Sequence, residues 1–286
     1  MLDRLERIEA ILADQREFLQ RNFSHLHLLH DRKRDEVVAY VLNNRTDINT
    51  EDTLPVLING CLVIIPTYLL KFIIHCRQPV NSPLLCFDIE TPHFEWIRNH
   101  TVPDEIVFDV GANIGLFTVA MSTWVNRGGM VYAFEPGRKI YGDLKALVAV
   151  NKCKNVVINN MAVGSSKGSV RFNELQSNDV SREASHVIQS GNSSEQGYEV
   201  EIIDLDSFCQ EQQLKPSLIK IDVEGFELHV IKGMKKILET MSPKLVIEIH
   251  GSVVENQELI ELRQILDNHS YTITELPKTW ACTKKT

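Results

Sequence analysis

Cysteine pairs and clustered basic residues are both missing from this 286-residue chain. None of its six cysteines belongs to a C-x-x-C pair, and most lie in apolar surroundings, so we expect buried thiols in a reducing compartment and neither disulfides nor zinc. The longest basic run is Arg32-Lys33-Arg34, and the net charge is −8. Because a nucleic-acid-binding surface needs a clustered cationic face, we expect no nucleic-acid partner.

A long uninterrupted apolar run is also missing. The most apolar stretch, residues 54–76, is broken by Asn59, Gly60, Pro66 and Lys71, which leaves pieces well short of the ~20 apolar residues that span a bilayer. We therefore expect buried strands or a core helix there and no transmembrane segment, although peripheral membrane contact stays open. The N-terminal stretch is dense in charges of both signs, unlike a secretory signal, so we expect a cytoplasmic protein.

The chain is predicted to have three parts. Residues 1–36 form an amphipathic helix because Leu5, Leu12, Leu19 and Leu26 recur every seventh residue, which suits either a coiled-coil homodimer or a helix packed on its own domain. Residues 37–103 are a connecting adapter region. From residue 104 to the end, strands and helices alternate, as in a parallel sheet with right-handed crossovers.

This alternation predicts an α/β fold, with a mostly parallel seven-stranded sheet and helices on both of its faces. The expected strands are 106–110, 130–134, 155–160, 199–204, 218–223, 245–250 and 271–275. The expected helices are 115–126, 138–150, 225–240 and 255–268.

The most informative segment is VFDVGANIG, residues 107–115. Its β-forming residues lead into a turn that carries Gly111 and Gly115, and apolar residues at helical spacing follow, so it reads as strand, tight turn and helix. Glycines let the backbone approach a ligand closely, and open α/β sheets bind their ligands at the carboxyl ends of strands. The turn is therefore a predicted nucleotide-type binding site.

Two acidic residues and one missing glycine indicate which ligand this turn binds. The dinucleotide fingerprint G-x-G-x-x-G fails at its second glycine, where Asn113 stands. Asp109 would repel a pyrophosphate and attract a positively charged cofactor, and Glu135 ends the second strand, where an acid binds ribose hydroxyls. The combination favours S-adenosylmethionine over NAD. The alternative is that Asp109 caps the helix and Glu135 is an ordinary solvated charge.

The chain also resembles a known family in several blocks. VFDVGANIG is followed by VYAFEP (131–136), NNMAVG (159–164), IKIDVEGFE (219–227) with IKGM behind it (231–234), and LVIEIHG (245–251). In order and spacing these blocks resemble the FkbM-type S-adenosylmethionine-dependent methyltransferases, from about residue 104 onwards. The resemblance implies a class I methyltransferase (Rossmann-like) fold and O-methylation of a hydroxyl, commonly on a sugar, a glycan or a natural-product precursor.

Eight residues are predicted to bind the cofactor. Met161 and Ala162 follow the third strand, where a class I methyltransferase packs the adenine ring, although they would suit the core equally well. The eight residues are Asp109, Gly111, Ala112, Asn113, Gly115, Glu135, Met161 and Ala162.

The chemistry is expected at two further strand ends. Asp222 and Glu224 follow one strand, and Glu248 and His250 follow another, so the four side chains should meet in the cofactor crevice. We expect Asp222 to contact cofactor or acceptor, and His250 to act as the base, since its unperturbed pKa of about 6.5 suits proton abstraction near neutral pH. Glu224 and Glu248 are further candidates.

The same four groups also suit a hard divalent cation, Mg²⁺ or Ca²⁺, that lowers the pKa of the acceptor. Against this, Glu224 could pair with Lys220 or cap a helix that begins at Gly225, and no residue is assigned as a metal ligand. Glu227 is expected to have a packing role.

Two other functional classes stay open at this point. One is an NAD-dependent oxidoreductase, which the G-A-N-I-G turn and Asp109 disfavour. The other is a catalytically inactive partner or scaffold protein with the same fold, which the strand-end acids disfavour. The sequence names a small-molecule or glycan hydroxyl as the acceptor class and does not identify the acceptor.

Overall fold

The computed structural model describes residues 53–58, 61–66, 69, 86–87, 91–126, 128–174, 186–187, 197–250 and 257–285. The chain divides into two compact units, Met1–Ile89 and Glu90–Thr286. The predicted helix over 1–36 and its homodimer contact lie outside the described residues.

The described part of the first unit is a small sheet. Strand β1 (Thr53–Ile58) pairs antiparallel with β2 (Cys61–Pro66), and β3 (Cys86–Phe87) runs parallel to β1. Ile58, Val63 and Ile65 are buried, so this part of the apolar stretch 54–76 forms buried strands. Among the described residues, no helix has the length and apolar character needed to cross a membrane.

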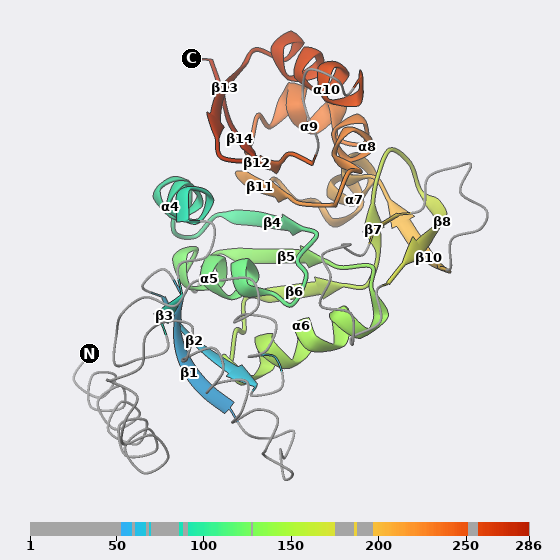
Figure 1. Cartoon of the computed structure of the whole chain (residues 1–286). Coiled ribbons are helices and arrows are strands. Elements are labelled where there is room, and N and C mark those ends of the chain that lie inside the picture. The colour runs from blue at the N-terminus through green and yellow to red at the C-terminus, as the bar shows by residue number, and fades with distance from the viewer. Residues whose placement is uncertain are drawn as a thin grey trace. The chain divides into compact units, whose positions relative to one another are not determined.

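A seven-stranded, mostly parallel sheet forms the centre of the second unit, as predicted (Figure 1). Five strands run parallel to their neighbours, while the last hairpin pairs antiparallel at one edge. In spatial order the strands are β13 (Tyr271–Leu276), β14 (Thr279–Lys284), β12 (Lys244–Glu248), β11 (Leu218–Ile221), β4 (Ile106–Val110), β5 (Met130–Phe134) and β6 (Val156–Asn159).

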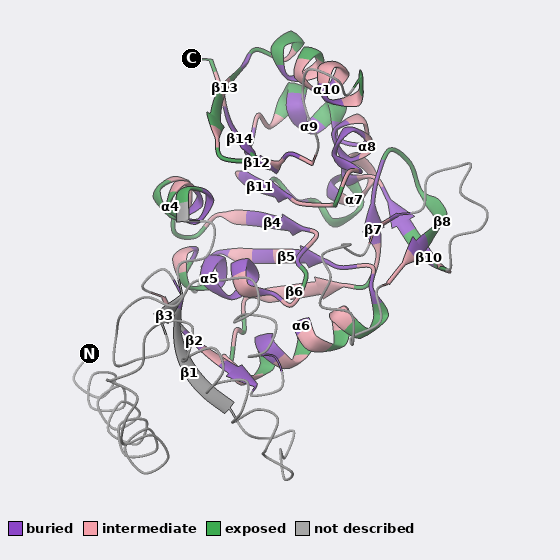
Figure 2. Ribbon diagram, viewed as in Figure 1, coloured by how far each residue is buried: buried purple, intermediate pink, exposed green. Residues whose placement is uncertain are grey.

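Helices cover both faces of this sheet. Helices α4 (Thr91–His100), α5 (Leu116–Trp124) and α6 (Arg138–Val150) form one layer, in which the Phe94 ring of α4 lies 4.9 Å from the Trp124 ring of α5. The opposite layer contains α7 (Leu205–Gln212), α8 (Glu227–Lys232), α9 (Lys235–Thr240) and α10 (Gln257–Asn268). Figure 2 shows the buried strands between these layers. Because β4 and β11 are covered on both faces, their sequences are almost continuously apolar.

A second sheet adjoins the carboxyl ends of the central strands (Figure 1). It has four strands in the order β7 (Ala162–Val163), β10 (Tyr198–Ile203), β8 (Gly168–Asn173) and β9 (His186–Val187). The segment predicted as central strand 199–204 is β10 of this sheet, and β14 takes its place in the central sheet. The alternating exposed and buried residues of β10 fit a sheet with only one covered face.

Two boundaries and one additional helix also differ from the sequence prediction. The second unit begins at Glu90, so α4 belongs to it, although we assigned residues 91–100 to the adapter region. The helix predicted over 225–240 is divided into α8 and α9 at Gly233 and Met234. Helix α7 was not predicted, although Asp204 caps it by accepting a hydrogen bond from the Ser207 backbone N–H at 2.7 Å.

Candidate active site

A cavity lies where the central sheet meets the second sheet. It has about 690 Å³ of empty space, which includes open solvent, and about 110 Å³ of this is accessible to the centres of water-sized spheres. One part of its wall comes from the ends of β4 and β5, another from the second sheet and a third from the segment after β11. The lining residues include Gly111, Asn113, Glu135, Met161, Ala162, Phe172, Val187, Asp222, Val223, Glu224 and Phe226.

The turn after β4 holds the first part of this wall. Gly111 has a φ of +75°, and a Cβ added there would lie 1.7 Å from the Asp222 carbonyl oxygen, so only glycine lets the ends of β4 and β11 approach this closely. The Gly111 and Ala112 N–H groups both donate to the Phe134 carbonyl at 3.0 Å. Gly111 and Asn113 line the cavity, whereas the predicted cofactor residues Ala112 and Gly115 are not among its lining residues. A Cβ on Gly115 would meet Leu144.

Glu135 is the buried acid of the cavity wall. Its carboxylate accepts hydrogen bonds from the backbone N–H groups of Asn113 at 2.9 Å and Gly137 at 2.8 Å. Burial raises the pKa of Glu135 to about 7, against the lowering effect of these two hydrogen bonds. It is therefore not the ordinary solvated charge of the alternative reading. It lines the cavity, and its predicted contact with the cofactor stays a prediction.

Asp109 is not among the residues that line the cavity, and its predicted contact with the cofactor stays a prediction. Its side chain is fully buried, where it accepts a hydrogen bond from Thr118 Oγ1 at 2.6 Å and lies 3.2 Å from Lys220 Nζ. Lys220 also lies 3.4 Å from Asp222 and donates to the Gly111 carbonyl at 3.2 Å. Lys220 thus forms a buried ion pair with Asp109 beside the turn.

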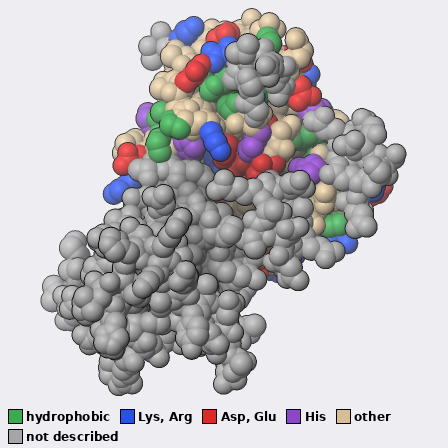
Figure 3. Space-filling view, viewed as in Figure 1, with side chains coloured by type: hydrophobic (Ala, Val, Ile, Leu, Met, Phe, Trp, Pro, Cys, Tyr) green, Lys and Arg blue, Asp and Glu red, His purple; other side chains and the backbone are tan. Residues whose placement is uncertain are grey.

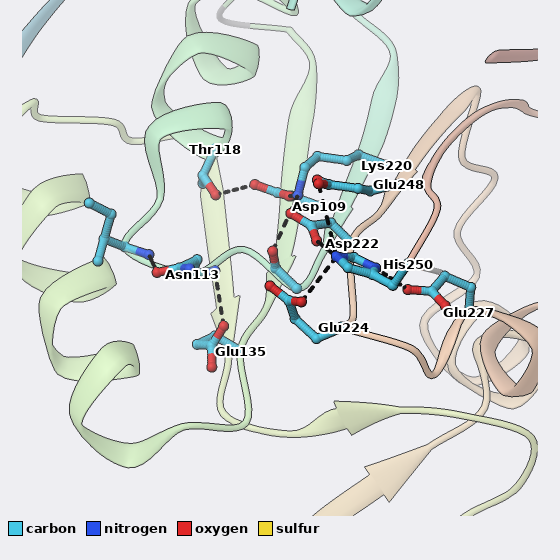
Figure 4. Close-up of polar contacts among 12 residues, drawn as sticks. Asp109, Asn113, Thr118, Glu135, Lys220, Asp222, Glu224, Glu227, Glu248 and His250 are labelled. Carbon is cyan, nitrogen blue, oxygen red and sulfur yellow. Dashed lines mark hydrogen bonds and ion pairs between the residues drawn. The ribbon is translucent and has the colours of Figure 1, made fainter. Parts of the chain in front are cut away.

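The four candidate catalytic residues meet at the ends of β11 and β12 (Figure 4). His250 Nε2 lies 3.0 Å from Glu224 Oε2, 3.9 Å from Glu248 Oε1 and 4.0 Å from Asp222 Oδ1. Figure 4 shows these three carboxylates on one side of the imidazole and Glu227 on the other. The structure thus brings together the group that the sequence placed in one crevice.

The surroundings of His250 bear on its predicted role as a base, which stays a prediction. Burial by itself would lower the pKa of His250, but hydrogen bonds to Glu224 and Glu227, with the charges of both carboxylates, raise it to about 11. In this arrangement the ring is an imidazolium near neutral pH, and both of its nitrogens donate. A proton-accepting role would require His250 to lose its Nε2 proton first.

Glu227 belongs to the site, although we expected only a packing role for it. Its carboxylate, with a side chain that is 3% exposed, lies 2.8 Å from His250 Nδ1 and accepts a hydrogen bond from the Gly225 N–H at 2.9 Å. Glu227 is in the first turn of α8, so the sequence suggested a residue on a helix surface. Its place in the matching block IKIDVEGFE was the signal for a role in the site.

Apolar side chains form the remaining wall. Met161 and Ala162 line the cavity together with Phe172, Val187 and Phe226 of the second sheet and the β11–α8 segment. These residues fit the predicted packing of an adenine ring. On the face shown in Figure 3, the described surface has basic side chains scattered among acidic and histidine side chains, rather than gathered in one area.

Comparisons with known proteins agree with this architecture. A model of the methyltransferase FkbM domain matches residues 109–273. The hexuronic acid methyltransferase AglP of Haloferax volcanii is 30% identical over 152 residues, which cover 52% of this chain and 58% of that protein. The chain thus spans less than two thirds of this curated relative.

Two solved structures are similar to the chain at lower sequence identity. The methyltransferase FkbM from Methylobacillus flagellatus KT is 20% identical with a TM-score of 0.44, over 63% of this chain and 43% of that one. The precorrin-6y C5,15-methyltransferase from Geobacter metallireducens GS-15 is 11% identical with a TM-score of 0.43, over 73% of this chain and 93% of that one. Because the family model covers more than half of the sequence, the chain belongs to the FkbM methyltransferase family.

Proposed function

We propose that the protein is an S-adenosylmethionine-dependent methyltransferase that methylates a hydroxyl oxygen. The observation that carries this proposal is the cavity itself, with the buried carboxylate of Glu135 at one side and the carboxylates of Asp222 and Glu224 at another. Hydroxyl donors of a ribose would satisfy Glu135, and the apolar wall at Met161 and Ala162 suits an adenine ring. The residues present therefore fit the cofactor.

The same wall disfavours a dinucleotide. A pyrophosphate needs backbone N–H groups free to donate at the first turn, but the Gly111 and Ala112 N–H groups are bonded to the Phe134 carbonyl. The Asn113 N–H is bonded to Glu135. In addition, Asp222 and Glu224 line the cavity, and their charges would repel a second phosphate.

In this proposal the residues at the ends of β11 and β12 hold the acceptor. S-adenosylmethionine, when bound, supplies a methyl group on a sulfonium. The acceptor oxygen provides the electron pair of the new bond, so its alignment contributes most of the rate. Asp222 and Glu224, which line the cavity, are placed to accept a hydrogen bond from the acceptor hydroxyl, to orient its oxygen and to take up its proton as the methyl group transfers. Glu227 and His250 form the rigid support behind them.

The acceptor class follows from the curated relative. AglP is described as a hexuronic acid methyltransferase, and we extend this substrate class to the present chain as a sugar or glycan that contains a uronic acid. A carboxylated sugar would meet Asp222, Glu224 and Glu248 at one side of the site, so its recognition needs a balancing positive charge there.

From this function we expect substitutions at the acceptor site to lower the rate of methyl transfer without weakening cofactor binding. With tritiated S-adenosylmethionine and a panel of uronic-acid glycosides, Asp222→Asn and His250→Gln should each lower methyl transfer by roughly 10²-fold or more, because the first removes a carboxylate beside the acceptor and the second removes the group that positions the carboxylates. Binding of S-adenosylhomocysteine, measured by calorimetry, should stay within a few-fold of the wild type. Glu261→Gln, which changes a half-exposed side chain of α10 that pairs with Lys232, is the matched control. Wild-type rates in both site variants would remove this assignment of the acceptor site.

A further inference from the structure

We propose that Asp222, Glu224 and His250 together bind a divalent metal ion at the edge of the cavity. One ligand atom from each residue lies within 4.8 Å of the other two. Asp222 and Glu224 come from the segment after β11 and His250 follows β12, so the site is assembled across two neighbouring strands. Its use in methyl transfer rests on the proposed function, whereas the binding of the ion does not.

The separations of the ligand atoms match an octahedral ion. His250 Nε2 lies 3.0 Å from Glu224 Oε2 and 4.0 Å from Asp222 Oδ1. Around an ion with bonds of about 2.1 Å, adjacent ligands lie ~3.0 Å apart and opposite ligands ~4.2 Å apart. Both observed separations are close to these values, and a larger ion such as Ca²⁺ would require the ligands to spread.

The orientation of the imidazole is fixed from outside the triad. Glu227, from α8, holds His250 Nδ1 at 2.8 Å with a carboxylate that is only 3% exposed. This contact leaves Nε2 directed toward Asp222 and Glu224, as Figure 4 shows. Metal-binding histidines are oriented in this way, because a carboxylate on the second nitrogen fixes the tautomer and makes the first nitrogen a better ligand. Binding of the ion would displace the Nε2 proton of the imidazolium to solvent.

The excess of carboxylates around the triad would attract a cation, and the donor atoms indicate which metal ion binds. Lys220 lies against Asp109 and Asp222, while Glu224, Glu227 and Glu248 surround His250, so carboxylates outnumber cationic side chains in this cluster. Oxygen donors suit Mg²⁺, Ca²⁺ and Mn²⁺, whereas imidazole suits later transition metals. The mixed donor set therefore favours Mn²⁺ over the Mg²⁺ or Ca²⁺ that the sequence suggested.

An ion at this place could coordinate the acceptor directly. Two of its ligands line the cavity, so its remaining coordination positions face the space in which an acceptor would bind. A coordinated hydroxyl has a lowered pKa, and it can release its proton to bulk water before its oxygen takes the methyl group. The ion would also supply the positive charge that a uronic acid needs beside these carboxylates.

Electron paramagnetic resonance of Mn²⁺ titrated into the metal-free full-length chain tests the site. We expect one bound ion whose spectrum shows coupling to an imidazole nitrogen. His250→Gln should abolish that coupling, and Asp222→Asn should weaken binding at least tenfold. Glu227→Gln, which keeps all three ligands, should weaken binding on the order of 10- to 100-fold. Glu261→Gln should bind as the wild type does.

Two results would overturn the metal site. One is a wild-type chain that binds no Mn²⁺, and the other is bound Mn²⁺ without nitrogen coupling. The wild-type spectrum needs no variant to fold, and thermal unfolding of each variant checks that the fold is intact. Binding of S-adenosylhomocysteine by the same metal-free preparation is the separate readout of the proposed function, so failure of the metal site and failure of the cofactor site are distinguishable.

Discussion

At the scale of single residues, Glu135 is a cavity-lining carboxylate whose pKa is set mainly by its burial. Its carboxylate is buried between the turn after β4 and the start of α6, and it receives two backbone hydrogen bonds. No positively charged side chain is hydrogen-bonded to it among the described contacts, so burial dominates and raises its pKa to about 7. A buried carboxylate of this kind is suited to accept hydrogen bonds from the hydroxyl groups of a ligand.

The raised pKa of Glu135 predicts a pH-dependent cost to stability. The unfolded chain loses this proton near pH 4.5 and the folded chain near pH 7, so the favourable contribution of Glu135 is full below pH 4.5 and disappears as pH rises through 7. Relative to the wild type, Glu135→Gln should gain roughly 2–3 kcal/mol of unfolding free energy between pH 4.5 and pH 8. Urea unfolding of both proteins at these two pH values measures the difference. Parallel pH profiles would contradict the buried carboxylate.

Asp109 shows what the sequence alone does not reveal about a residue. Its position at the end of a strand and next to a glycine turn was predicted correctly. Its partner Lys220 is distant in sequence and reaches it only because β11 lies beside β4 in the sheet. Strand order decides whether such a carboxylate faces the ligand or a buried lysine, and a single sequence does not give that order directly.

At the scale of elements, the turn between β4 and α5 is the most tightly constrained. Gly111 requires a positive φ and has the Asp222 carbonyl 1.7 Å from where a Cβ would lie. Gly142, inside α6, has no atom within 4 Å of that position. The two glycines therefore form a matched pair for substitution by alanine.

We expect alanine at Gly142 and alanine at Gly111 to have opposite effects on the free energy of unfolding. Gly142→Ala should raise the free energy of unfolding by about 0.5–1 kcal/mol, because alanine is the better helix former. Gly111→Ala forces the ends of β4 and β11 apart, so it should lower stability by more than ~3 kcal/mol, the range of strongly disruptive changes. Thermal or urea unfolding of both variants measures these changes in stability. A Gly111→Ala protein as stable as the wild type would contradict the close approach of the two strands.

Burial on both faces explains which strands could be predicted. The strands β4, β5, β11 and β12 are mostly apolar, because both faces of the central sheet are covered, and their positions agree with the prediction within a few residues. The alternating pattern of β10 looked like one more central strand. The short strands β7 and β9 have only two residues each, which is too few for any periodic signal.

At the scale of the whole second unit, the site combines two edges of one cavity. The edge at β4 and β5 contributes Gly111, Asn113 and Glu135, and the edge after β11 contributes Asp222 and Glu224. The sequence predicted both edges, because parallel strands bring their carboxyl ends to one side of a sheet. It missed Glu227, whose contact with His250 depends on how α8 packs beside the end of β12.

The measurement that tests this account most directly is calorimetric titration of the wild-type chain with S-adenosylhomocysteine and, separately, with NADH. The account predicts micromolar binding of S-adenosylhomocysteine alone, with clearly weaker binding by Glu135→Ala, which lacks the carboxylate for the ribose, and unchanged binding by Glu261→Gln. Binding of NADH alone would contradict the cofactor assignment. Binding of neither would contradict catalysis and favour a partner or scaffold protein with a methyltransferase fold.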